Sequence, residues 1–181
     1  MDAITLPITT QLYVVIGGQP AANQLLNLAA RLALRGPLLL LDCGNRANPL
    51  PLVRELRRLT PDPVQALRNI HSARAFTCYQ TAALLDQTSR LPQPRPVLIF
   101  DLLATFYDEN ITCTESRRLL EQALHRIGHI RHSAAIVVSA RPPLAAFPER
   151  KGFLELVCRL SDRYWVEETP PSTQPQQPSL F

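Results

Sequence analysis

The segment Gly17–Gln24, with the sequence GGQPAANQ, lies where a phosphate-binding loop would lie. An apolar run precedes it, and leucines and alanines at helical spacing follow it. In a working loop, a lysine reaches the β and γ phosphates and the next hydroxyl holds Mg²⁺. Counted from Gly17, these two positions hold Asn23 and Gln24. The pattern therefore predicts a degenerate nucleotide site that keeps Gly17 and Gly18 but lacks the lysine and the hydroxyl.

The size and composition of the chain are those of an ordinary globular protein. Its 181 residues suit one domain, and 46% of them are apolar and 19% charged. No apolar run approaches the roughly 18 residues of a membrane span, and the N-terminus lacks the features of a signal peptide. We therefore expect a cytoplasmic protein that makes no membrane contact. The net charge of +4 permits nucleic-acid binding without requiring it.

Apolar runs alternate with amphipathic segments along the chain. This alternation predicts an α/β fold with a mostly parallel central sheet and helices on both faces. The composition changes at Glu168, after which proline, glutamine and serine dominate. We therefore expect a core domain of residues 1–167 and a disordered tail of residues 168–181. The expected strands are 12–16, 37–42, 69–76, 97–102, 134–139 and a closing pair at 153–160 and 163–167; the expected helices are 24–34, 51–59, 81–88 and 115–130.

Three stretches follow the first loop in a distinctive order: LLLLDCGNRANP (38–49), NIHSARAFTCYQTAALL (69–85) and VLIFDLLATFYDEN (97–110). Together with the strand, loop and helix at 13–34, they resemble the ATPase core of the RecA and RadA recombinase family. The resemblance covers about residues 12–166. It implies a RecA-like P-loop NTPase fold in a single domain and a function linked to DNA.

The same resemblance identifies where the chain departs from an active ATPase. Asp101 matches the Walker B aspartate that supports Mg²⁺, but the glutamate that polarises the attacking water aligns with Gly44. Asp42, two residues earlier, is not placed for that role, and the polar sensor sequence is replaced by 139–141 (Ser-Ala-Arg). Loss of one such electrostatic contact typically costs about 100- to 1,000-fold in rate. We therefore expect a pseudo-ATPase that has no catalytic residue, metal or cofactor, including ATP and Mg²⁺.

The candidate DNA contacts also follow from the resemblance. The family holds DNA with two loops, which correspond roughly to residues 107–115 and 141–152. The second loop contains Arg141, Arg150 and Lys151, a set suited to phosphate contacts. The first loop is acidic and would repel phosphates.

Three histidines on the expected helix 115–130 and just beyond it have a spacing that could suit metal ligands. They are His125, His129 and His132. Near the end of a helix, however, positive charge in solvent suits the helix dipole, and we expect them to face solvent.

The last five residues, QPSLF, resemble the bacterial sliding-clamp-binding peptide. In that reading Leu180 and Phe181 are apolar anchors for a groove on the clamp, and Gln177 makes polar contacts. Pro178 stands where leucine is common.

These features predict a catalytically degenerate RecA/RadA-like accessory protein in DNA recombination, repair or damage-tolerant synthesis. It would act as an adaptor, as do small RecA-related accessory proteins of bacterial mutagenic-repair operons. The expected partners are a recombinase or polymerase-associated subunit and, through the tail, the sliding clamp. Two alternatives stay open: a weakly active, DNA-dependent ATPase that uses Asn23 and Gln24 as phosphate ligands, and a nucleotide-independent single-stranded DNA-binding protein.

Overall fold

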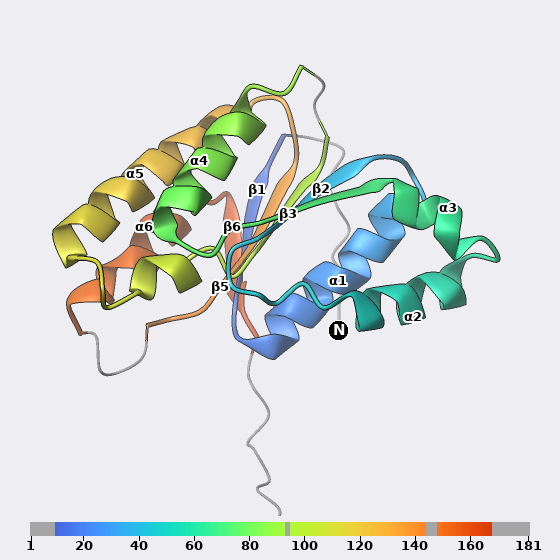
Figure 1. Ribbon diagram of the computed structural model, residues 1–181, viewed down its shortest axis with the longest axis horizontal. Helices are drawn as coiled ribbons and strands as arrows, with labels where there is room; N and C mark the ends of the chain where they lie inside the picture. The colour runs from blue at the N-terminus through green and yellow to red at the C-terminus, as the bar shows by residue number, and fades with distance from the viewer. Residues whose placement is uncertain (1–9, 93–94, 144–147, 168–181) are drawn as a thin grey trace, which may run out of the picture.

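Six strands form one sheet in the order β3-β2-β4-β5-β1-β6, and all five neighbouring pairs are parallel. Figure 1 shows this sheet in the computed structural model, which describes residues 10–92, 95–143 and 148–167. Every residue of β4 and β5 is buried, because both strands lie inside the sheet with helices over each face. The strands are β1 Leu12–Ile16, β2 Leu38–Asp42, β3 Ile70–Arg74, β4 Val97–Phe100, β5 Ile136–Ala140 and β6 Arg163–Val166.

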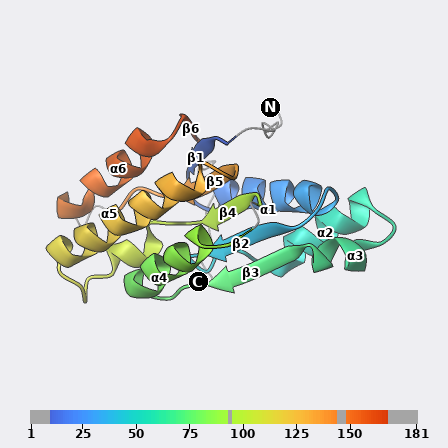
Figure 2. The same cartoon turned by 90° about the horizontal axis from the view of Figure 1, so that it is seen from above.

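Helices cover both faces of the sheet (Figures 1 and 2). One face carries α1 (Gln19–Ala33), α2 (Pro49–Leu59) and α3 (Pro63–Arg68), and the other carries α4 (Cys78–Ser89), α5 (Cys113–Ile130) and α6 (Gly152–Leu160). Two apolar clusters, one on each face, form the core. Two short 3-10 turns, η1 (Ala104–Tyr107) and η2 (Pro148–Arg150), complete the described elements. The predicted α/β fold with a parallel sheet and helices on both faces is confirmed, and this architecture is compatible with a RecA-like domain.

One predicted strand is a helix. Residues 153–160 form most of α6, in which Phe153 and Val157, four positions apart, are the buried residues. That spacing places both side chains on one helical face, whereas a strand would bury alternate residues. Only β6 remains of the predicted closing pair of strands.

The first helix begins earlier than the sequence pattern suggests. It starts at Gln19, with Pro20 in the first turn, where the missing proline N–H needs no partner. The helix α3 was not predicted, although Asp62 caps it by accepting a hydrogen bond from the Gln65 N–H, and Pro63 begins it. Among the described helices, none combines the length and apolar character needed to cross a membrane.

Candidate functional site

The residues that the resemblance assigned to a nucleotide site meet at the carboxyl edge of the sheet, where ligands bind in open parallel sheets. Asp42 ends β2, Asp101 follows β4, Ser139 lies in β5, and Gly17 follows β1. The fold therefore brings together four chain segments that are far apart in the sequence.

The glycines after β1 do not open a phosphate-binding loop. The Gly17 N–H donates to the carbonyl of Ala140 at 2.9 Å, which extends the sheet pairing by one residue. Helix α1 begins two residues later, so Asn23 and Gln24 lie inside this helix. The Asn23 side chain accepts a hydrogen bond from Gln19 at 3.0 Å. Some of the backbone N–H groups that would surround a phosphate in a working loop are thus already bonded. The Gly17 N–H pairs within the sheet, and the Ala22 N–H donates to the Gly18 carbonyl at the start of α1.

Asp101 is the central residue of the site. It is 3% exposed, and its φ of 50° lies in the left-handed region that few residues other than glycine adopt. Its N–H donates to the Ser139 hydroxyl at 2.9 Å. Its Oδ2 lies 3.0 Å from the Arg141 Nε and 3.5 Å from the Arg46 Nε. Ser139 in β5 therefore binds the backbone of Asp101, while Arg141, just after β5, and Arg46, in the turn after β2, pair with its carboxylate.

Gly44 provides the space that the Asp101 side chain occupies. A Cβ at position 44 would lie 2.4 Å from the Asp101 Cβ and 2.6 Å from its Oδ2. Both distances are far shorter than van der Waals contact, so a side chain at position 44 would have to displace Asp101. A glutamate cannot be accommodated there without such a displacement. The Asp101 side chain therefore occupies the space that a side chain at position 44 would need.

Asp42 organises the turn that carries Arg46. Its Oδ1 accepts a hydrogen bond from the Arg46 N–H at 2.9 Å, and its Oδ2 accepts from the Ala47 N–H at 3.3 Å and from the Arg74 Nε at 3.0 Å. These contacts use both carboxylate oxygens. Asp42 therefore holds the backbone of the turn that follows β2.

The charges at this edge do not suit a Mg²⁺ ion. Asp42 and Asp101 are paired with guanidinium groups from Arg46, Arg74 and Arg141. A divalent cation close to Asp101 would be repelled by the two arginines already beside it. The residues present therefore do not fit a bound Mg²⁺ ion.

Burial raises the pKa of the Asp101 carboxyl, and the Arg141 and Arg46 guanidiniums partly oppose this rise. A carboxyl whose pKa is higher in the folded chain than in the unfolded chain binds protons more tightly when folded. Stability therefore falls as pH rises through the interval between the two pKa values.

We expect Asp101→Asn to remove this dependence, since asparagine has the same shape and tolerates a positive φ. The measurement is urea unfolding of wild type and variant at several pH values. The free energy of unfolding of the variant, relative to that of wild type, should increase as pH rises and then level off above the folded pKa. A difference that stays constant or decreases with rising pH would contradict the assigned shift.

The three candidate DNA contacts have different surroundings. Arg141 is half-buried and faces Asp101. Arg150 is 3% exposed, and its guanidinium donates to the carbonyls of Phe106, Asp108 and Ile111 at 2.7–2.8 Å. Lys151, next to it, is exposed. In this conformation Lys151 is the member of the set whose side chain is open to solvent.

The clamp-binding candidates Gln177, Leu180 and Phe181 lie outside the described residues.

His125 and His129 of α5 are exposed, as expected. The described part of the chain holds no group of three His, Cys, Asp or Glu residues that could bind a metal.

Sequence reasoning missed Arg46 and Arg74. A signal for Arg46 was present, because it lies four residues after Asp42 in a turn marked by glycine, asparagine and proline. Arg74 ends β3 and is in register with Asp42 of the neighbouring strand, a pairing visible only once the strand order is known.

A search of protein-family models finds no match to this chain, and a search of curated protein sequences finds none either. The fold and the site themselves define the structural class. The chain is an α/β protein with an all-parallel, six-stranded sheet, and the carboxyl edge of this sheet holds aspartates paired with arginines.

Proposed function

We propose that this protein is a catalytically degenerate RecA/RadA-like protein that acts as an adaptor in DNA recombination, repair or damage-tolerant synthesis. The observation that carries the proposal is the contact between Gly44 and Asp101. It leaves no room for a water-polarising glutamate at the aligned position.

The changes at this edge support one another. Gly44 makes space for Asp101, the Ser139 hydroxyl accepts from its N–H, and Arg141 pairs with its carboxylate. Each of these residues replaces a group that the resemblance assigns to nucleotide chemistry. Phosphoryl transfer depends on charge stabilisation and positioning, so the combined loss is incompatible with useful turnover. A protein that has the fold of an ATPase but not the residues for ATP hydrolysis is more suited to binding other proteins than to catalysis.

The proposal is tested by affinity capture from the native host. The full-length chain and a variant lacking residues 177–181 serve as baits. We expect the full-length bait to recover a recombinase or polymerase-associated subunit together with the sliding clamp. The shortened bait should lose the clamp and keep the other partner. Equal recovery of the clamp by both baits would contradict the role of the tail, and recovery of neither partner would contradict the adaptor role.

Nucleotide-independent binding of single-stranded DNA is the alternative that this experiment does not address. Its signature is an affinity that falls steeply with salt, because each phosphate contact releases counterions. Loss of that affinity in Lys151→Ala would favour the alternative over the adaptor role.

A further inference from the structure

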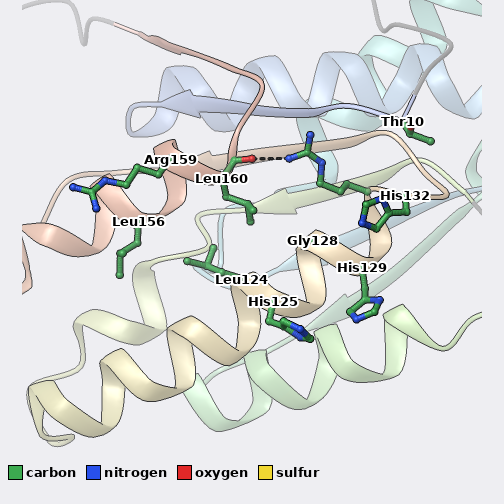
Figure 3. Close-up of a pocket in the computed structure, with 10 residues that line it drawn as sticks. Thr10, Leu124, His125, Gly128, His129, His132, Leu156, Arg159 and Leu160 are labelled. Carbon is green, nitrogen blue, oxygen red and sulfur yellow. Dashed lines mark hydrogen bonds between the residues drawn. The ribbon is translucent and has the colours of Figure 1, made fainter.

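A groove of about 700 Å³ runs between α5 and α6 (Figure 3). We call it the α5–α6 groove. Helix α5 packs much more extensively on α4 than on α6, which leaves space between α5 and α6. Leu124 from α5 and Leu156 and Leu160 from α6 line the groove and are each half-buried. The groove therefore has an apolar lining that the rest of the described chain does not fully cover.

Gly128 lies in the same groove, in the last turn of α5. Glycine is, after proline, the least favourable residue inside a helix. Among the described glycines only Gly17 and Gly36 have positive φ, so no special backbone conformation requires glycine at position 128. A Cβ there would meet nothing within 4 Å, so packing within the described chain does not require it either. A glycine of this kind suits the close approach of another molecule.

The remaining lining of the groove is rich in hydrogen-bond donors. Among the residues that the structure describes, it includes two arginines and three histidines and no aspartate or glutamate. The Arg131 guanidinium is engaged, because it donates to the Leu160 carbonyl (dashed line in Figure 3) and to Asp162. Arg159 forms only a loose ion pair with Glu155, at 3.8 Å, and both side chains are more than 70% exposed. Such exposed pairs contribute little, so Arg159 can exchange its partner readily.

We propose that the α5–α6 groove docks an acidic amphipathic segment of a partner protein. Apolar side chains of the segment would pack on the three leucines and approach Gly128, and its carboxylates would pair with Arg159 and accept hydrogen bonds from the histidines. This is the helix-in-groove mode of recognition. Single-stranded DNA could use the histidine rings and the arginines, so an oligothymidine is the competing ligand in the test. The three leucines offer no ring on which a base can stack, and they favour the amphipathic segment. The inference rests on the proposed adaptor function.

The test uses the full chain and a fluorescent helical peptide of about 18 residues with leucines on one face and glutamates on the other. Fluorescence anisotropy should show saturable binding to wild type. Gly128→Leu, which fills the groove, and Arg159→Glu, which reverses its charge, should each weaken binding about tenfold or more. Asn27→Leu and Arg58→Glu are controls on α1 and α2, which cover the opposite face of the sheet. Asn27 is an exposed helical position, and the exposed Arg58 also lies 3.8 Å from a glutamate.

Three results would overturn the inference: no binding of the peptide, binding that the groove variants and the controls alter equally, or tighter groove-dependent binding of an oligothymidine than of the peptide. A peptide carrying lysines in place of the glutamates should not bind. The outcome is distinguishable from failure of the proposed function. If clamp or recombinase capture succeeds while the peptide does not bind, the adaptor role stands and only this groove is wrongly assigned.

Discussion

Replacing Gly44 with alanine should lower the free energy of unfolding by about 1–3 kcal/mol, the usual cost of forcing an extra methyl group into a packed site. The new Cβ would lie 2.4 Å from that of Asp101. Asp101 cannot move away cheaply, since Ser139 holds its N–H and Arg141 its carboxylate. Urea unfolding measures the loss, and the melting temperature should fall by several degrees.

Two further variants test the cause of this loss. Asp101→Gly removes the contacting Cβ and suits the φ of 50° at that position. In that background, Gly44→Ala should cost at least about 1 kcal/mol less than in wild type, which a double-mutant cycle detects. Gly152→Ala is the control, because its Cβ would meet nothing within 4 Å. If Gly44→Ala is no more destabilising than this control, the close contact is wrong.

The second large effect is expected for Arg150→Ala, which should cost about 3 kcal/mol or more. Arg150 is buried, and its guanidinium donates to three carbonyls in residues 106–111. Its removal leaves these acceptors without a charged donor inside the protein, and each unsatisfied buried group costs about 1–3 kcal/mol. Denaturant unfolding measures the change.

The neighbouring Lys151→Ala provides the control and should change stability by less than about 0.5 kcal/mol, because Lys151 is exposed. Arg150→Lys separates a structural role from a DNA role. A lysine keeps the charge but lacks the planar fork of donors, so stability should still fall. Unchanged stability combined with weaker DNA binding in Arg150→Ala would show that this residue contacts DNA instead.

Much of the fold could be predicted from the sequence because its strong signals are local. The apolar runs of β2, β4 and β5 are continuous, as strands buried on both faces require. The periodicity of α5 extends over five turns. α6 was mistaken for a strand, because its nine residues are mostly apolar and too few for their periodicity to distinguish a helix from a strand.

The site was only partly predictable, since its residue types could be read from the sequence but its contacts could not. In the sequence, Gly44 stood where the resemblance predicts a glutamate. In the structure, the Asp101 side chain occupies the space that a side chain at position 44 would need. Arg141 and Arg150 were predicted as possible phosphate contacts, yet in the structure Arg141 faces a carboxylate and Arg150 donates to backbone carbonyls. Such pairings depend on strand order and on turns that bring distant residues together, which no local pattern encodes.

Thermal unfolding with and without Mg-ATP tests most directly whether the carboxyl edge of the sheet is closed to nucleotide. A ligand present at 100 times its dissociation constant stabilises the folded state by about 2.7 kcal/mol, which would raise the melting temperature by roughly 5–10 °C. Because Asp101 occupies the space that a side chain at position 44 would need and arginines pair with both aspartates, we expect no shift at millimolar Mg-ATP. A saturable rise in melting temperature that Asp101→Ala abolishes would contradict this account.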